Sequence, residues 1–350
     1  MYDGVFQNIV ECDKTVHMST GFWNKLPKPF FVQAPMADVT DAAFRRIIAK
    51  YAKPDVLWTE FVAVDGLLSP GREVLLRDFM YSEAERPIVA QIFGGKPQNF
   101  EKVAQMIVQL GFDGIDINMG CPDRNVEKQG GGANLMKDPS RAQEIIFATK
   151  AGAGALPVSV KTRVGYNQVE LETWLPALLE TKPDAVTIHA RTRKEMSDVP
   201  ARWEHVRRAV EIRSVLSPGT LIIGNGDIKD LDDAKAKAKE SGADGVMLGR
   251  AIFGNPWLYA STELNLSRLN LDKFDDEKMI REKLSVMVEH TKLFEELLGD
   301  VKNFATVKKH YKAYVNGFLG AKELRIKLME TNNGVEVEEI VREFLGTLKN

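Results

Sequence analysis

The chain has 350 residues, of which 44% are hydrophobic and 27% are charged, and its formal net charge is −2. This composition is typical of a globular protein with room for one large domain and a smaller one, and it excludes a polycation that binds nucleic acid with its whole surface. We expect a cytoplasmic protein without a metal site, because no apolar run could cross a bilayer, no secretory signal is visible, and the only cysteines are Cys12 and Cys121.

The first three quarters of the chain alternate between apolar runs and segments with helical periodicity. The expected strands are 30–35, 55–60, 87–92, 114–119, 158–163, 185–190, 221–226 and 245–250. The expected helices include 41–52, 99–111, 140–152, 169–181, 202–214 and 231–242. This alternation predicts parallel βαβ units, and eight of them predict a (β/α)₈ TIM barrel over residues 30–262. The alternative is an open doubly wound sheet, but such a sheet usually has a Gly-rich turn after its first strand, and Ala34-Pro35-Met36 stands there instead.

The segments outside the expected barrel differ in character. From about residue 263 the strand-like runs stop, and helical periodicity over 275–298, 303–318, 321–331 and 335–348 predicts a C-terminal helical bundle domain, 263–350. Residues 263–274 are the expected junction. Residues 1–29 form a weakly patterned N-terminal extension, we assign no function to residues 1–17, and Met18 is an alternative start.

Polar side chains stand at the ends of the predicted strands, where the active site of such a barrel lies. They are Gln91, Asn118, Lys161, Arg163, His189, Arg191, Asn225 and Arg250, and the first strand ends at Pro35 and Met36. Glycine-bearing turns, Gly224-Asn225-Gly226-Asp227 and Gly249-Arg250, follow the seventh and eighth strands, which is the usual phosphate site of this fold. A cation such as Lys161, with His189 beside it, suits the N1–C2=O edge of a flavin, so a phosphorylated flavin is one interpretation.

Cys121 lies in the turn after the fourth strand, next to Pro122 and before three consecutive glycines, Gly130 to Gly132. Structural cysteines usually sit within apolar runs, so this position favours a thiol that meets a substrate. The alternative is a cysteine that simply caps a strand.

Six motifs together resemble those of the tRNA-dihydrouridine synthases. They are Ala34-Pro35-Met36, Asn118-Met119-Gly120-Cys121-Pro122, Val160-Lys161-Thr162-Arg163, Ile188-His189-Ala190-Arg191-Thr192-Arg193, Gly224-Asn225-Gly226-Asp227-Ile228 and Gly249-Arg250. Beyond the barrel, Val307-Lys308-Lys309-His310-Tyr311 and the segment from Gly320 to Arg325 resemble the family's tRNA-binding domain. One departure concerns the segment after Arg193, where many members carry an aromatic residue and this chain has Lys194-Glu195-Met196-Ser197-Asp198.

The resemblance implies an enzyme in which NADPH reduces bound FMN, hydride passes to C6 of a uracil base in tRNA, and Cys121 donates a proton to C5. It assigns the cofactor to Pro35, Met36, Gln91, Lys161, His189, Asn225, Gly226, Asp227, Gly249 and Arg250. It assigns the substrate to Asn118, Arg163, Arg191, Arg193, Lys308, Lys309, Lys312 and Arg325. An unperturbed thiol holds its proton at neutral pH, so we expect Lys161 and Arg163 to face the flavin and base rather than the sulfur. A monomer is the default expectation.

The basic stretch between residues 302 and 327 is a second indication of nucleic-acid binding. It holds a single acid, Glu323, against the basic residues Lys302, Lys308, Lys309, Lys312, Lys322, Arg325 and Lys327. Lys308 and Lys312 are four apart, which predicts one helix face, with Tyr311 and Tyr314 interleaved. The alternative is a solvated face without a partner.

Three other functions remain open on sequence alone. The first is a small-molecule FMN oxidoreductase of the dihydroorotate type, which the basic C-terminal domain disfavours. The second is a Schiff-base aldolase that uses Lys161 and would be colourless. The third is a non-catalytic RNA-binding protein in which the barrel is a scaffold.

Overall fold

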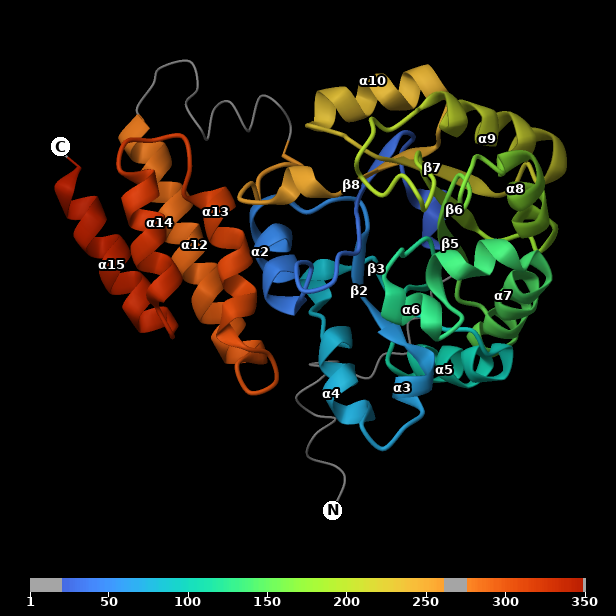
Figure 1. The fold of residues 1–350 in the computed structure, drawn as a ribbon, viewed down its shortest axis with the longest axis horizontal. Coiled ribbons are helices and arrows are strands. Elements are labelled where there is room, and N and C mark those ends of the chain that lie inside the picture. The colour runs from blue at the N-terminus through green and yellow to red at the C-terminus, as the bar shows by residue number, and fades with distance from the viewer. Residues whose placement is uncertain (1–20, 261–275, 349–350) are drawn as a thin grey trace.

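The structure is a computed structural model that describes residues 21–260 and 276–348 (Figure 1). Eight parallel strands pair in the order β1-β8-β7-β6-β5-β4-β3-β2. A parallel bridge between Val32 and Val56 joins β1 to the chain entering β2, so the sheet closes on itself. The strands are β1 Phe30–Gln33, β2 Leu57–Ala63, β3 Ile88–Phe93, β4 Gly114–Met119, β5 Val158–Arg163, β6 Ala185–His189, β7 Leu221–Asn225 and β8 Gly245–Leu248. The predicted barrel is confirmed, and the open sheet is excluded.

Helices cover the outside of the barrel. The long ones are α2 Ala42–Ala52, α5 Pro97–Gln109, α7 Pro139–Ala153, α8 Leu171–Glu180, α9 Glu204–Leu216 and α10 Leu231–Ser241, each within a few residues of its predicted range. The short ones are α3 Val64–Leu67, α4 Arg72–Leu76, α6 Arg124–Lys128, η1 Phe22–Lys25, η2 Arg77–Phe79, η3 Glu83–Glu85, η4 Gly132–Lys137 and η5 Arg250–Ile252. The sequence does not predict the short helices, because one turn carries too few residues to show a period.

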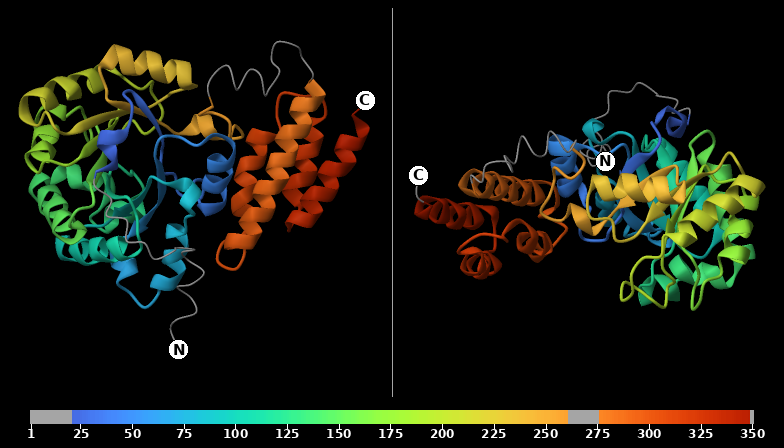
Figure 2. Two further views of the ribbon diagram at one scale, coloured as in Figure 1. Left: turned by 180° about the vertical axis from the view of Figure 1, so that it is seen from behind. Right: turned by 90° about the horizontal axis from the view of Figure 1, so that it is seen from above.

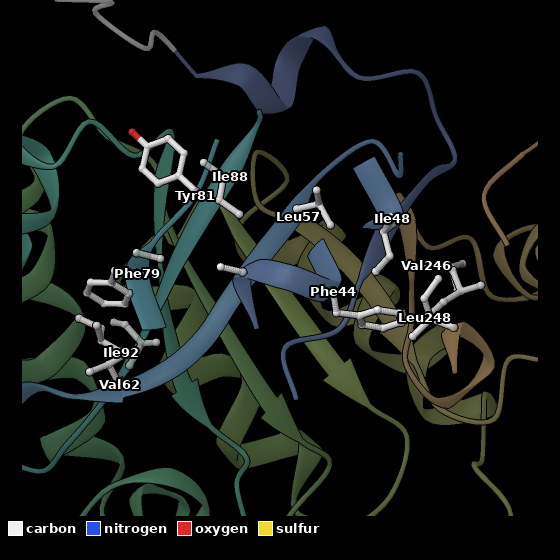
Figure 3. Close-up of a cluster of buried hydrophobic side chains, with 14 of the residues drawn as sticks. Phe44, Ile48, Leu57, Val62, Phe79, Tyr81, Ile88, Ile92, Val246 and Leu248 are labelled. Atoms are coloured by element: carbon white, nitrogen blue, oxygen red, sulfur yellow. The ribbon is translucent and has the colours of Figure 1, made fainter. Parts of the chain in front are cut away.

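Two apolar clusters hold this architecture together. One lies between the strands and the surrounding helices. In Figure 3, Phe44 and Ile48 of α2 are drawn beside Val246 and Leu248 of β8, and all four are buried. The other fills the inside of the barrel at the amino-terminal ends of the strands, where the ring centroid of Trp23 lies 5.6 Å from that of Phe30. Trp23 and its neighbour Phe22 therefore close that end, although both lie in the weakly patterned N-terminal extension.

The C-terminal helices pack against one side of the barrel, beside α2 (Figures 1 and 2). They are α12 Asp276–Leu298, η6 Phe304–His310, α13 Tyr311–Tyr314, α14 Ala321–Glu330 and α15 Gly334–Thr347. The predicted single helix 303–318 is wrong, because a 3₁₀ segment and one α-turn replace it and the chain leaves the helix after Tyr314 toward Gly317, whose φ is 81°. The expected junction 263–274 lies outside the described residues.

The contact between barrel and C-terminal helices is tight and partly aromatic. Phe44 of α2 stacks on His290, with ring centroids 5.0 Å apart, and its ring lies 4.4 Å from that of His310. A Cβ added at Gly254 would lie 2.2 Å from the carbonyl oxygen of Ala313, so the two backbones touch there. The buried rings and the backbone contact indicate a fixed arrangement of the two parts.

Candidate active site

A pocket of about 500 Å³ opens at the carboxyl ends of the strands, where the sequence predicted the site. Its lining comes from nearly every strand end, and Phe61 of β2, Ser197 and Lys229 contribute to it without having been predicted. The predicted residues that line it are Pro35, Met36, Asn118, Cys121, Lys161, Arg163, His189, Arg191, Asn225, Gly226, Asp227, Gly249 and Arg250. The structure therefore brings most of the predicted side chains together.

Cys121 is held by the backbone around it. The side-chain oxygen of Asn118 accepts hydrogen bonds from the N–H of Gly120 at 3.1 Å and of Cys121 at 2.9 Å. Gly132, with φ at 58°, leaves no room for a side chain, because an added Cβ would lie 2.7 Å from the carbonyl oxygen of Cys121. Asn118 and the glycine-rich loop thus fix the position of the thiol.

Burial raises the pKa of the Cys121 thiol above its ordinary value, and the nearby cations Arg163 and Lys161 lower it by less. The Arg163 guanidinium donates to the carbonyl oxygens of Gly120 at 2.8 Å and of Thr192 and Met196 at 3.0 Å each. The thiol keeps its proton at neutral pH, which an acid requires.

Lys161 is the cation at the centre of the pocket. Its Nζ lies 3.4 Å from the side-chain oxygen of Asn225. Burial, with the repulsion of Arg163, lowers the pKa of Lys161 to about 8. The ammonium is therefore charged at neutral pH, but only narrowly.

Asp116 lies beneath the pocket and was not predicted. Its carboxylate accepts from Gln91 Nε2 and from Ser159 Oγ, each at 2.6 Å, and Gln91 in turn accepts from Asn118 Nδ2 at 3.1 Å. Burial raises the pKa of Asp116 to about 6. Gln91 is thus a support for Asn118 and does not line the pocket. Asp116 and Asn118 are two residues apart in β4, so their side chains point to the same face of the strand. This spacing could have indicated Asp116 as a residue of the site.

Asp227 and Arg250 belong to the two glycine-bearing turns and form a charged cluster with Arg191. Asp227 bonds Arg191 and Arg250, while the Nη1 of Arg191 lies 3.2 Å from His189 Nε2. A guanidinium only donates, so Nε2 accepts and the neutral ring carries its proton on Nδ1. Burial, together with Lys161, holds the pKa of His189 well below its usual range. Lys161 is therefore the charged member of the Lys161–His189 pair.

Arg193 lies at the rim of the pocket, outside its lining. It pairs with Glu127, with Nε–Oε1 at 2.8 Å and Nη2–Oε2 at 2.6 Å. Its guanidinium carbon is 5.2 Å from the centroid of the Tyr166 ring, and Lys137 Nζ is 3.9 Å from the same centroid. The rim beside Cys121 thus combines an aromatic ring with two cations.

None of the predicted basic residues of the C-terminal helices lines the pocket, and their side chains have different partners. Lys308 Nζ donates to the carbonyl oxygen of Met329 at 2.8 Å, and Lys309 pairs with Asp38 of the barrel at 3.0 Å. Arg325 donates to the carbonyl oxygen of Val315 at 2.6 Å, whereas Lys312 is exposed. Tyr311 and Tyr314 are buried and do not interleave with the lysines at the surface.

None of the helices within 21–260 and 276–348 is both long and apolar enough to span a bilayer. In the same ranges, no three His, Cys, Asp or Glu side chains are placed to share a metal ion.

Known proteins resemble this chain over most of its length. The family profile described as dihydrouridine synthase (Dus) matches residues 32–349. A "Probable tRNA-dihydrouridine synthase" of Staphylococcus aureus (strain MRSA252) is 41% identical over 93% of this chain and 96% of its own length. A "Probable tRNA-dihydrouridine synthase 2" of Bacillus subtilis (strain 168) is 40% identical over 93% of this chain and 97% of its own. Morphinone reductase in complex with tetrahydroNAD superposes with a TM-score of 0.48 at 13% identity, over 70% of this chain and 89% of that one, too distant a likeness to bear on function.

Proposed function

The chain belongs to the dihydrouridine synthase family, and we propose that it reduces the C5–C6 double bond of specific uridines in tRNA, with FMN as cofactor and NADPH as reductant. The observation that supports this most is a protonated thiol, Cys121, in the same pocket as the buried ammonium of Lys161. A reduction of this kind needs a proton donor on one side of the base and a group that stabilises negative charge on the other.

The pocket residues fit a flavin phosphate and ring. Gly249 and Arg250, in the turn after β8, line the pocket, and backbone N–H groups in such a turn suit an anion. Arg250 is largely exposed beside that turn and can form a charge-assisted contact with a phosphate, in competition with Asp227. Lys161 and the neutral His189 would lie along the ring. A bound FMN, once reduced by NADPH, would supply the hydride that C6 of the base accepts.

The chain's own groups complete the reaction. Cys121 gives its proton to C5 of the base, and the sulfur is left as a thiolate that must regain a proton before the next turnover. Asn118 keeps the thiol in place through the two backbone N–H groups that it accepts from, and Gln91 orients Asn118. A uracil in folded tRNA is stacked, so it must leave the stack to enter a pocket at the strand ends.

The C-terminal helices would hold the tRNA. Exposed Lys312, Lys322 and Lys327 stand in a stretch with a single acid, and lysines in such a stretch suit phosphate contacts. Lys308 and Arg325 are half-buried and bonded to backbone carbonyls, so their positions are fixed. Arg193 with Tyr166 and Lys137 offers a second contact at the pocket rim.

One experiment tests the proposal as a whole. The purified protein should be yellow, should release FMN on treatment with acid, and should form dihydrouridine in unmodified tRNA when NADPH is added. A colourless protein that cannot be reconstituted with FMN would rule the proposal out and would favour the Schiff-base or the non-catalytic alternative.

A further inference from the structure

The side chain of Lys302, in the turn between α12 and η6, contacts two carboxylates of the barrel domain instead of pointing to solvent. Its Nζ donates to Glu60 Oε2 at 2.6 Å and lies 2.8 Å from Asp78 Oδ1. The exposed fractions of the Lys302 and Glu60 side chains are 14% and 5%. A strongly basic stretch thus contributes one lysine to a buried ion cluster on the barrel.

The other oxygen of Glu60 holds the turn that follows β1. Glu60 Oε1 accepts from the backbone N–H of Asp38 at 2.5 Å. Asp38 has a φ of 55°, a left-handed conformation that residues other than glycine rarely adopt. The hydrogen bond from Glu60 therefore helps to hold Asp38 in an unfavourable backbone conformation, and Lys309 pairs with the Asp38 carboxylate at 3.0 Å.

This turn carries a wall of the pocket. The N–H of Met36 donates to Thr40 Oγ1 at 2.9 Å, and the N–H groups of Val39 and Thr40 donate to the Met36 carbonyl at 3.1 and 3.0 Å. Because these bonds close the turn around Asp38, a shift of Asp38 must shift Met36. Met36 lines the pocket, and so does Phe61, the residue next to Glu60.

The charges around Glu60 make Lys302 necessary. Burial and the neighbouring carboxylates Asp78 and Asp41 raise the pKa of Glu60 to about 7, and Lys302 opposes that rise. Without the ammonium, Glu60 would take up a proton or turn toward water, since an uncompensated carboxylate is costly in such a place. Either change weakens its hydrogen bond to Asp38.

We propose that Lys302 is a positioning residue, which acts through Glu60 and the Asp38 N–H to fix Met36 in the pocket wall. The C-terminal helices thereby set the shape of a site to which they contribute no lining residue. The inference rests on the proposed function only where it concerns a bound flavin, because the position of the turn can be measured without a cofactor.

The test compares Lys302→Met with Lys50→Met in the full chain. Lys50 of α2 pairs with Glu289 of α12 at 2.6 Å, so its loss also removes an ion pair between barrel and helices, but one that does not touch the turn. Hydrogen exchange, followed by mass spectrometry, should be about tenfold faster over residues 36–40 in Lys302→Met, which is the effect of losing one bond to a charged acceptor. Lys50→Met should exchange there like the wild type.

The second readout is the dissociation constant for FMN, measured by the quenching of flavin fluorescence. It should rise about tenfold in Lys302→Met and return toward the wild-type value in Lys302→Arg, which can still donate to Glu60. Should Lys302→Met fail to fold, Glu60→Gln keeps the size of the side chain and should also speed exchange over 36–40.

The outcomes separate the two proposals. If exchange over 36–40 is unchanged in Lys302→Met, or equally fast in Lys50→Met, the positioning role is wrong whatever the cofactor. If the wild-type protein binds no FMN while the exchange results are as expected, the proposed function fails and the positioning role stands.

Discussion

Arg193 and Glu127 form a two-bond ion pair that ties the loop after β6 to α6, the short helix that follows Cys121. Their side chains are 25% and 13% exposed, so the pair is partly shielded from solvent. Arg193 Nη2 also lies 3.4 Å from the carbonyl oxygen of Pro122, the residue next to the thiol. We conclude that this pair restrains the thiol as well as the rim.

We predict that Glu127→Gln lowers turnover on tRNA roughly tenfold, because a loosened loop misplaces the proton donor and small misplacements are costly. The free energy of unfolding should change by less than about 1 kcal/mol, as is usual for a partly exposed pair. Steady-state kinetics and chemical denaturation measure the two effects. Arg208→Gln, which removes an exposed pair with Glu172, is the matched control and should leave turnover unchanged. Equal turnover in Glu127→Gln and the wild type would show that the pair is dispensable.

Replacement of the proton donor should separate two half-reactions. Cys121→Ala should lose turnover on tRNA by about 10²–10⁴-fold, the usual contribution of a general acid. It should still bind FMN and oxidise NADPH in the absence of tRNA, because the thiol takes no part in those steps. Absorbance at the flavin band and stopped-flow reduction by NADPH check this. A variant that modifies tRNA at the wild-type rate would exclude Cys121 as the acid.

The pKa of about 8 for Lys161 predicts an alkaline limit of activity. Lys161 is cationic below that pH and neutral above it, so the charge that it would offer to a bound flavin ring is lost as pH rises. We expect kcat/KM to fall as pH rises through about 8. In Lys161→Arg, which keeps its charge, this fall should occur at higher pH. The measurement is a pH–rate profile for both proteins. An identical alkaline limb in both would assign it to another group.

The sequence predicted the parts of the site that depend on local pattern. Strand ends could be read from apolar runs, so Lys161, His189 and Asn225 were placed correctly in one pocket. The roles of Gln91 and Lys309 could not be read, because each is decided by a partner distant in sequence, Asp116 and Asp38 respectively. Charge alone does not tell whether a lysine faces solvent, phosphate or a buried carboxylate.

The buried histidine His310 predicts a loss of stability in acid. Burial lowers the pKa of His310 from its usual 6.5 to about 3, so the unfolded chain binds a proton that the folded protein rejects between these values. The free energy of unfolding therefore falls as pH drops through that window, with a contribution on the order of 1 kcal/mol per pH unit. His310→Phe, which keeps a ring against Phe44, should show a flatter dependence in urea titrations between pH 6.5 and 4. The same slope in both proteins would contradict this account.

The exposed Lys312 allows a clean test of RNA contact, since it lies outside the ion pairs with the barrel described above. Lys312→Ala should weaken tRNA binding and should make the slope of log affinity against log salt shallower by roughly one unit, the signature of one lost phosphate contact. FMN content should not change. Lys235→Ala on α10 serves as the control of equal charge. An unchanged salt slope in Lys312→Ala would mean that this lysine faces only solvent.

Phe22 and Trp23 close the amino-terminal end of the described barrel, so the active-site pocket opens at the carboxyl ends of the strands. Under the proposed function a nicotinamide and a flipped base would both enter through this opening, and we predict that they use it in turn. The oxidised dinucleotide would have to depart before the RNA docks, so initial rates measured at several concentrations of each reactant should give parallel double-reciprocal lines.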